Sequence, residues 1–143
     1  MDKTTKSRLS AVAIFAVTFA IAFFGTKYFF SGNSADKELG AIAAEMNRSN
    51  PVQVDSETRL ESVESLGGAK VRYNFTLVNV DKQTTSLDLE ELQASIKENA
   101  QRILNENAKM EAFRKANVTM QYHYKDKNGK ELFDFSIAPA KNN

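Results

Sequence analysis

The segment KVRYNFTLVNV, residues Lys70–Val80, decides the fold because its side chains alternate strictly in polarity. The apolar positions are Val71, Tyr73, Phe75 and Leu77. The positions between them are polar: Arg72, Asn74 and Thr76. Successive side chains of a β-strand point to opposite faces of the sheet, so this pattern predicts one buried face and one solvated face. Such a strand is typical of an antiparallel sheet that is covered on one side only.

Two hairpins are predicted around this strand. The extended segment Pro51–Val63 precedes it, and Gly67-Gly68 supplies the turn between the two. Further along the chain, Val118–Tyr124 and Leu132–Ile137 alternate in the same way. Between them, Asn128-Gly129 is the dipeptide that favours a primed hairpin turn. The two pairs predict four strands in one antiparallel sheet.

Three helical segments complete the predicted domain: Asp36–Arg48, Ser86–Asn107 and, as a continuation or a second short helix, Ala108–Lys115. The resulting order is α-β-β-α-(α)-β-β. It predicts an α+β domain over residues 36–143, with two layers: a four-stranded antiparallel sheet of two hairpins, and helices on one face. The other face is expected to be polar and exposed, and to carry Arg72, Asn74, Thr76, Thr119, Gln121, His123, Asp134 and Ser136.

An apolar segment near the start of the chain predicts contact with a lipid bilayer. Leu9–Gly25, LSAVAIFAVTFAIAFFG, carries no charge, and Tyr28–Phe30 adds aromatic residues of the kind found at membrane interfaces. A helix over Leu9–Gly25 would be about 25 Å long, at the short end for a bilayer core of about 30 Å. We predict a transmembrane signal anchor over residues 9–30 and a linker over residues 31–35. The alternatives are a cleaved signal peptide, for which Asn33-Ser34-Ala35 is a poor cleavage site, and a buried soluble helix.

Charge on either side of this segment predicts its orientation. Lys3, Lys6 and Arg8 precede it, opposed only by Asp2. Basic flanks remain on the cytoplasmic side, so residues 1–8 are expected to form a cytoplasmic tail. The rest of the chain would then be the periplasmic domain of a single-pass inner-membrane protein. A eukaryotic type II membrane protein is the alternative. Its glycosylation sequons would begin at Asn47, Asn74 and Asn117.

Composition excludes several classes of function. The chain of 143 residues has no cysteine. A disulfide framework, a thiol nucleophile and a lipoprotein lipidation site are therefore excluded. Four basic residues and one acidic residue precede Ser31, which leaves 15 basic and 17 acidic residues beyond it. This slight negative charge predicts no nucleic-acid partner, because nucleic-acid binding requires a basic face.

Candidate catalytic residues are few. His123 is the only histidine, and without cysteine a metal site would depend on carboxylates, so neither a metal site nor a cofactor is predicted. Its place on a predicted strand favours a solvent-facing sheet histidine. No dinucleotide-binding, phosphate-loop, kinase or zinc-protease motif occurs. The chain is therefore predicted not to be an enzyme. The alternative is an envelope-polymer hydrolase that uses Asp55, Glu57 or His123.

Three segments resemble a known group of proteins. They are NPVQVDSETRL at Asn50–Leu60, Tyr73-Asn74-Phe75, and YHYKDKNG at Tyr122–Gly129. Together they resemble small bacterial membrane-anchored envelope proteins of unknown function. The resemblance covers most of the outer domain and implies a bacterial origin and an exported fold. It implies no catalytic residue.

The sequence thus predicts a binding or accessory module for an envelope protein or complex. The expected binding residues are Asp55, Thr58, Arg59, Arg72, Asn74, Gln121 and His123. The first three of these residues could instead have a purely structural role: Asp55 and Thr58 could cap a turn, and Arg59 could pair with a neighbouring acid. A further alternative makes the membrane segment itself the interaction element, through closely spaced alanines. These are Ala13, Ala16, Ala20 and Ala22. The oligomeric state is not predicted.

Overall fold

The computed structural model describes residues 35–53, 56–86 and 88–140. The predicted tail and anchor, residues 1–30, lie outside these ranges, as do residues 31–34 of the predicted linker. No helix within the described ranges is long and apolar enough to cross a bilayer. The predicted transmembrane helix is therefore no part of the described fold.

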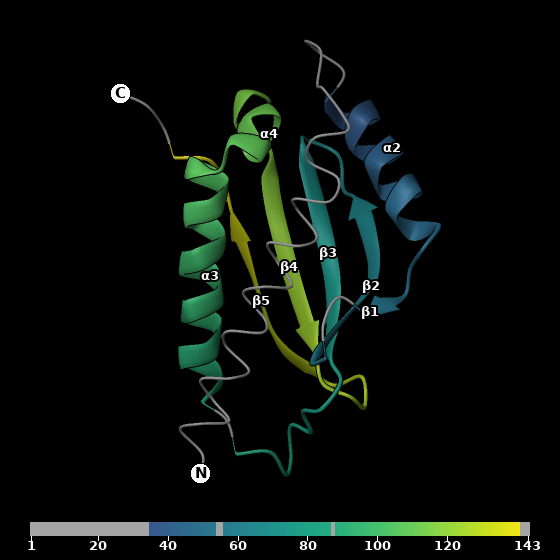
Figure 1. The fold of residues 1–143 in the computed structure, drawn as a ribbon, viewed down its shortest axis with the longest axis vertical. Helices are drawn as coiled ribbons and strands as arrows, with labels where there is room; N and C mark the ends of the chain where they lie inside the picture. The colour runs from purple at the N-terminus through teal and green to yellow at the C-terminus, as the bar shows by residue number, and fades with distance from the viewer. Residues whose placement is uncertain (1–34, 54–55, 87, 141–143) are drawn as a thin grey trace.

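Five strands form one mixed sheet (Figure 1). The strands are β1 (Val52–Gln53), β2 (Thr58–Ser65), β3 (Lys70–Leu77), β4 (Thr119–Lys125) and β5 (Glu131–Ile137). They lie side by side in the order of the chain. The central pair, β3 and β4, is parallel, whereas the other neighbours are antiparallel.

The prediction of a four-stranded antiparallel sheet is therefore wrong in two respects. The segment Pro51–Val63 does not form one strand, because β1 pairs antiparallel with β2 as a separate, two-residue edge strand. Moreover, β3 and β4 run in the same direction, from the pair Lys70 and Thr119 to the pair Thr76 and Lys125. The helical connection returns the chain to the end of the sheet at which β3 began, and a crossover of this kind makes neighbouring strands parallel (Figure 1).

Both predicted hairpins are present as antiparallel strand pairs, β2–β3 and β4–β5. In the first turn Gly67 and Gly68 have φ angles of +82° and +62°, which glycine adopts without the steric penalty of a Cβ atom. The carboxylate of Asp36 accepts hydrogen bonds from the N–H groups of Gly68 (3.1 Å) and Ala69 (2.6 Å). The turn is thereby attached to the beginning of the first described helix.

Helices pack against one face of the sheet. They are α2 (Ala35–Asn47), α3 (Leu89–Glu106), the 3-10 turn η1 (Ala108–Met110) and α4 (Glu111–Lys115). The α3 helix begins later than the predicted Ser86, because Asp88 caps it and accepts a hydrogen bond from the Glu91 N–H (3.1 Å). In Figure 1, α3 lies beside β5 and α2 lies beside β2.

One hydrophobic core joins the two layers. Leu39 and Ile42 of α2, and Leu92 and Ile96 of α3, are almost fully buried together with the apolar residues of the strands. The strand residues include a stacked aromatic series: Tyr73, Phe75, Tyr122, Tyr124, Phe133 and Phe135. Burial raises the pKa of Tyr73 and of Tyr122. The alternation in Lys70–Val80 thus correctly predicts which side of β3 is buried.

A helix side chain closes part of the sheet edge. Because β1 pairs only with Arg59 and Leu60, the outer side of β2 extends beyond it. There the Asn47 side chain donates from Nδ2 to the Val63 carbonyl (2.8 Å) and accepts at Oδ1 from the Val63 N–H (2.8 Å). One amide therefore satisfies both main-chain groups, as a neighbouring strand would do.

Candidate functional site

The sheet face opposite the core carries most of the predicted binding residues, and we call it the polar face. Its members include Arg59, Glu61, Ser62, Glu64, Arg72, Asn74, Thr76, Thr119, Gln121, His123, Lys125, Glu131, Asp134 and Ser136. They come from β2, β3, β4 and β5. Because neighbouring strands are in register, these side chains form rows that cross the sheet.

Arg72 is the centre of the polar face. Its Nε donates to Asn74 Oδ1 (3.1 Å), and its Nη1 donates to Gln121 Oε1 (3.3 Å). Its Nη2 lies 2.8 Å from Nδ1 of His123. A guanidinium presents several donors in a fixed planar arrangement. This single side chain therefore links β3 to β4.

Further hydrogen bonds extend the row to the outer strands. The Asn74 amide donates from Nδ2 to Ser62 Oγ (3.0 Å) and to Glu64 Oε1 (2.9 Å) on β2. On the other side, His123 Nε2 lies 2.8 Å from Oε1 of Glu131 on β5. We call Glu64, Asn74, Arg72, His123 and Glu131 the polar row. It orders side chains across four strands.

The contacts of His123 define its tautomer. Nδ1 lies 2.8 Å from Arg72 Nη2, which can only donate, and farther, at 3.2 Å, from the acceptor Asn74 Oδ1. The shorter contact assigns Nδ1 of the neutral ring as the acceptor, so that Nε2 carries the proton that it donates to Glu131. The residue is only 4% exposed, so the prediction of a solvent-facing histidine is wrong. Thr76, at 6% exposed, is buried as well. Long side chains on the neighbouring strands shield both residues from solvent, which alternation along a single strand cannot show.

A second group of the polar face surrounds Glu61. Its Oε2 accepts hydrogen bonds from Thr76 Oγ1 (2.6 Å) and from Arg59 Nε (2.7 Å). Burial alone would raise the pKa of Glu61, but these two hydrogen bonds and the charge of Arg59 outweigh it and hold the pKa below its ordinary value of 4.5. This carboxylate therefore remains ionised, and it forms a fixed acceptor beside the polar row.

The structure brings together four of the seven predicted binding residues: Arg72, Asn74, Gln121 and His123. Arg59 lies on the same face, opposite Thr76. Thr58 is fully buried opposite Leu77, on the core side, so it is no part of the polar face. Asp55 lies outside the described residues.

Sequence reasoning missed the acidic members of the site. Glu61 and Glu64 come from β2 and Glu131 from the start of β5. Glu64 accepts from the Asn74 amide and Glu131 contacts the His123 ring, whereas Glu61 holds Arg59 of its own strand and the Thr76 hydroxyl of β3. A bulge between Leu60 and Ser62 shifts the alternation in β2, which hid the face on which Glu64 lies. The sequence does hold one feature that could have revealed them: residues of opposite charge stand at positions that become cross-strand neighbours.

The residues of the hydrolase alternative do not converge in the described part of the chain. The Glu57 carboxylate accepts a hydrogen bond from Asn79 Nδ2 (2.6 Å), whereas both ring nitrogens of His123 are engaged by residues of the polar row. The described residues also contain no group of three or more histidine, aspartate or glutamate side chains placed to hold a metal ion.

The β4–β5 turn is held by a buried aspartate. The Asp126 carboxylate accepts hydrogen bonds from the N–H groups of Lys82 (2.8 Å), Asn128 (2.8 Å) and Lys130 (2.9 Å). The bond from Lys82, together with those from Lys130 and Asn128, holds the pKa of Asp126 below its ordinary value of 3.8. This one side chain joins the β4–β5 hairpin to the loop after β3.

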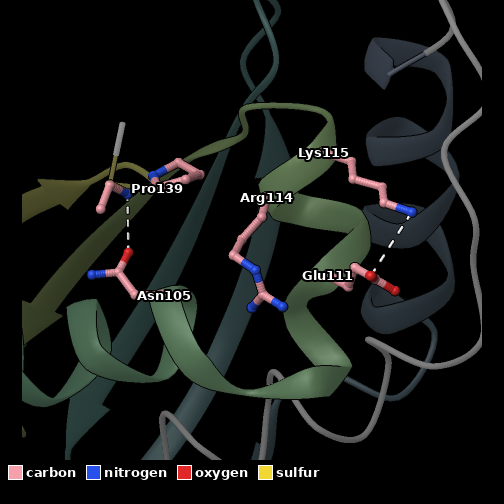
Figure 2. Close-up of a pocket in the computed structure, with 6 residues that line it drawn as sticks. Asn105, Glu111, Arg114, Lys115 and Pro139 are labelled. Carbon is pink, nitrogen blue, oxygen red and sulfur yellow. Dashed lines mark hydrogen bonds and ion pairs between the residues drawn. The ribbon is translucent and has the colours of Figure 1, made fainter. Parts of the chain in front are cut away.

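A pocket of about 510 Å³ lies apart from the polar face, between the end of α3, α4 and the segment after β5 (Figure 2). Its described lining consists of Asn105, Glu111, Arg114, Lys115, Pro139 and Ala140. Two of these side chains are basic and one is acidic. The pocket therefore forms a second candidate site, distinct from the predicted one.

Comparison with solved structures finds two matching chains. A pilotin from the Vibrio vulnificus type 2 secretion system, EpsS, matches with a TM-score of 0.53 and 11% sequence identity, over 74% of this chain and 93% of that chain. A candidate secreted protein from Pseudomonas aeruginosa matches with a TM-score of 0.48 and 8% identity, over 75% of this chain and 95% of that one. At this identity the pilotin match shows a similar fold.

Sequence comparison assigns the family. No curated protein matches the chain. A family described as a domain of unknown function, DUF8479, matches residues 33–133, which covers every described helix and strand except the last part of β5. The chain therefore belongs to the DUF8479 family.

Proposed function

We propose that this chain is a non-enzymatic binding or accessory module of the bacterial envelope, and that it recognises a protein partner through the polar face. The observation that carries the proposal is the polar row. Its hydrogen bonds hold Arg72, Asn74 and His123 in fixed positions before any partner arrives. Preordered side chains lose less conformational entropy on binding than free ones.

Two further observations support the proposal. The pocket beside α4 and a smaller one along α3, lined by Glu90, Gln93, Ala94 and Lys97, contain no residue of the polar face, which favours a protein surface as its counterpart. The fold is similar to that of a pilotin from a type 2 secretion system. On this basis we infer an accessory role for the present chain.

The compartment is part of the proposal and rests on the sequence before residue 35. The uncharged segment Leu9–Gly25 follows a basic flank, which favours export of what comes after it. We therefore place the domain on the periplasmic side of the inner membrane. Its partner is then expected among envelope proteins rather than among nucleic acids.

The test is co-purification of the full-length chain from its native membranes after solubilisation in detergent. Asp134→Arg places a long, oppositely charged side chain on the polar face without removing a hydrogen bond of the polar row. Glu98→Arg is the matched control, since it makes the same charge change on an exposed position of α3. A partner that is recovered with wild type and with Glu98→Arg, but is lost with Asp134→Arg, supports the proposal.

Two outcomes would overturn it. A partner retained equally by wild type and by Asp134→Arg would place recognition elsewhere on the molecule. Equal loss with Asp134→Arg and with Glu98→Arg would show a general effect of charge rather than recognition by the polar face.

A further inference from the structure

The pocket beside α4 has the size of a ligand site. Its volume of about 510 Å³ falls within the range of roughly 300–1,000 Å³ that is typical of small-molecule pockets. Three separate elements contribute to it: the last turn of α3, α4, and the residues that follow β5 (Figure 2). The pocket is therefore built by the tertiary fold and not by one local segment.

Arg114 is positioned in this pocket by the end of α3. Its Nη1 donates to the main-chain carbonyls of Leu104 (2.9 Å) and Asn107 (2.7 Å). These carbonyls carry only partial charges. Within the described residues, Arg114 forms no ion pair, and neither its Nε nor its Nη2 donates a hydrogen bond. A half-buried guanidinium thus retains a full charge and free donors.

The remaining polar side chains add donors to the same pocket. The Oδ1 of Asn105 accepts hydrogen bonds from the Ala140 N–H (3.0 Å) and from Gln101 Nε2 (3.0 Å), which fixes the amide and leaves its Nδ2 as a donor. Lys115 Nζ lies 3.8 Å from Glu111 Oε2, and both side chains are largely exposed. A pair of this kind contributes little, so Glu111 does not neutralise the pocket.

We propose that this pocket binds an oxyanion, a carboxylate or phosphate group, carried by a small ligand. The guanidinium fork matches the geometry of both groups, and Asn105 and Lys115 supply further donors around it. The pocket is much larger than a bare ion, so the rest of the ligand occupies the space that Pro139 and Ala140 border. This inference does not depend on the polar face.

Calorimetric titration of the full-length chain in detergent tests the inference, with citrate and inorganic phosphate as the two probes at low ionic strength. Binding of citrate alone identifies a carboxylate ligand, and binding of phosphate alone identifies a phosphate ligand. Arg114→Gln should weaken binding by about tenfold or more, because it removes charge-assisted hydrogen bonds. Lys115→Gln should weaken it by about two- to fivefold.

Arg114→Gln also removes the contacts to α3, so it could weaken binding by disturbing the fold. Glu111→Gln is a second variant that is free of this problem. It retains those contacts and removes the only carboxylate of the described lining, so binding should be retained or tighten slightly. Arg102→Gln is the control, because Arg102 lies on α3 outside the pocket and should bind as wild type does. The inference is overturned if neither probe binds, if Glu111→Gln weakens binding, or if Arg102→Gln weakens it as much as Arg114→Gln.

Discussion

Arg72 Nη2 donates a hydrogen bond to His123 Nδ1 across the parallel β3–β4 pair, at 2.8 Å. The donor carries a permanent charge, so the accepting nitrogen must be unprotonated. The opposite ring nitrogen faces the Glu131 carboxylate at 2.8 Å and carries the proton. One buried ring therefore connects a cation to an anion, and its orientation depends on both.

The tautomer of His123 is the first prediction. In the neutral ring, the proton is expected on Nε2, because Arg72 occupies Nδ1 as a donor. A long-range ¹H–¹⁵N correlation spectrum of the full-length protein should show an unprotonated Nδ1. Arg72→Leu should release this preference and give a mixture of tautomers. A ring protonated on Nδ1 in the wild-type protein would contradict the arrangement.

Replacing Arg72 by lysine is expected to destabilise the fold by about 1–3 kcal/mol. A single ammonium group cannot reach Asn74, Gln121 and His123 with the geometry of the guanidinium. The free energy of unfolding, measured in urea, tests this. Arg102→Lys is the control, since Arg102 is exposed and, among the residues that the structure describes, bonds only to Asn99 on its own helix. Equal effects of the two variants would show that the polar row contributes no stability.

Asp126 predicts a component of acid sensitivity. Its folded pKa lies below its ordinary value, so the ionised carboxylate stabilises the fold above about pH 4, and this contribution is lost as the pH falls through the folded pKa. Asp126→Asn replaces one acceptor oxygen by an amide that opposes the Lys82 N–H. The variant should therefore be less stable than wild type near neutral pH, and the difference should shrink in acid.

Urea unfolding at about pH 7 and about pH 3 measures this difference. Asp134→Asn is the matched control: its carboxylate is exposed and accepts no hydrogen bond from the described residues, so its effect should be small at both values. A destabilisation by Asp126→Asn that is equal at the two pH values would show that the Asp126 contribution does not depend on its charge.

Local patterns in the sequence predict the helices and strands well, because these elements depend mainly on interactions between residues close together in the chain. Alternation identifies β3 and its buried face, and helical spacing identifies α3. Asn128-Gly129 correctly marks the position of the β4–β5 turn, but the predicted primed turn is wrong, because only Gly129 of the pair has a positive φ, +83°, and the loop extends from Asp126 to Lys130. The relation between the hairpins is not local. Whether β4 pairs parallel or antiparallel with β3 depends on which end of the sheet the chain reaches after α3, and no pattern within either strand records it.

The candidate site could likewise be predicted only where it depends on local patterns, and not where it depends on contacts between strands. Alternation places Arg72, Asn74 and His123 on one face, but it cannot show that the ring becomes buried. That burial depends on side chains from β3 and β5 that meet only in the folded sheet. The bulge in β2 and the two-residue β1 also escape detection, since each depends on pairing with a neighbouring strand rather than on its own residues.

The contact between Asn47 and Val63 gives the last prediction. Asn47→Ala removes both hydrogen bonds from the main chain of Val63, and the fold should lose about 1–3 kcal/mol of stability. Asn47→Asp retains the acceptor for the Val63 N–H but loses the donor to its carbonyl, so the two variants separate the two bonds. Hydrogen exchange at the Val63 amide should accelerate in Asn47→Ala and remain slower in Asn47→Asp. An unchanged exchange rate in Asn47→Ala would mean that other groups protect this edge of β2.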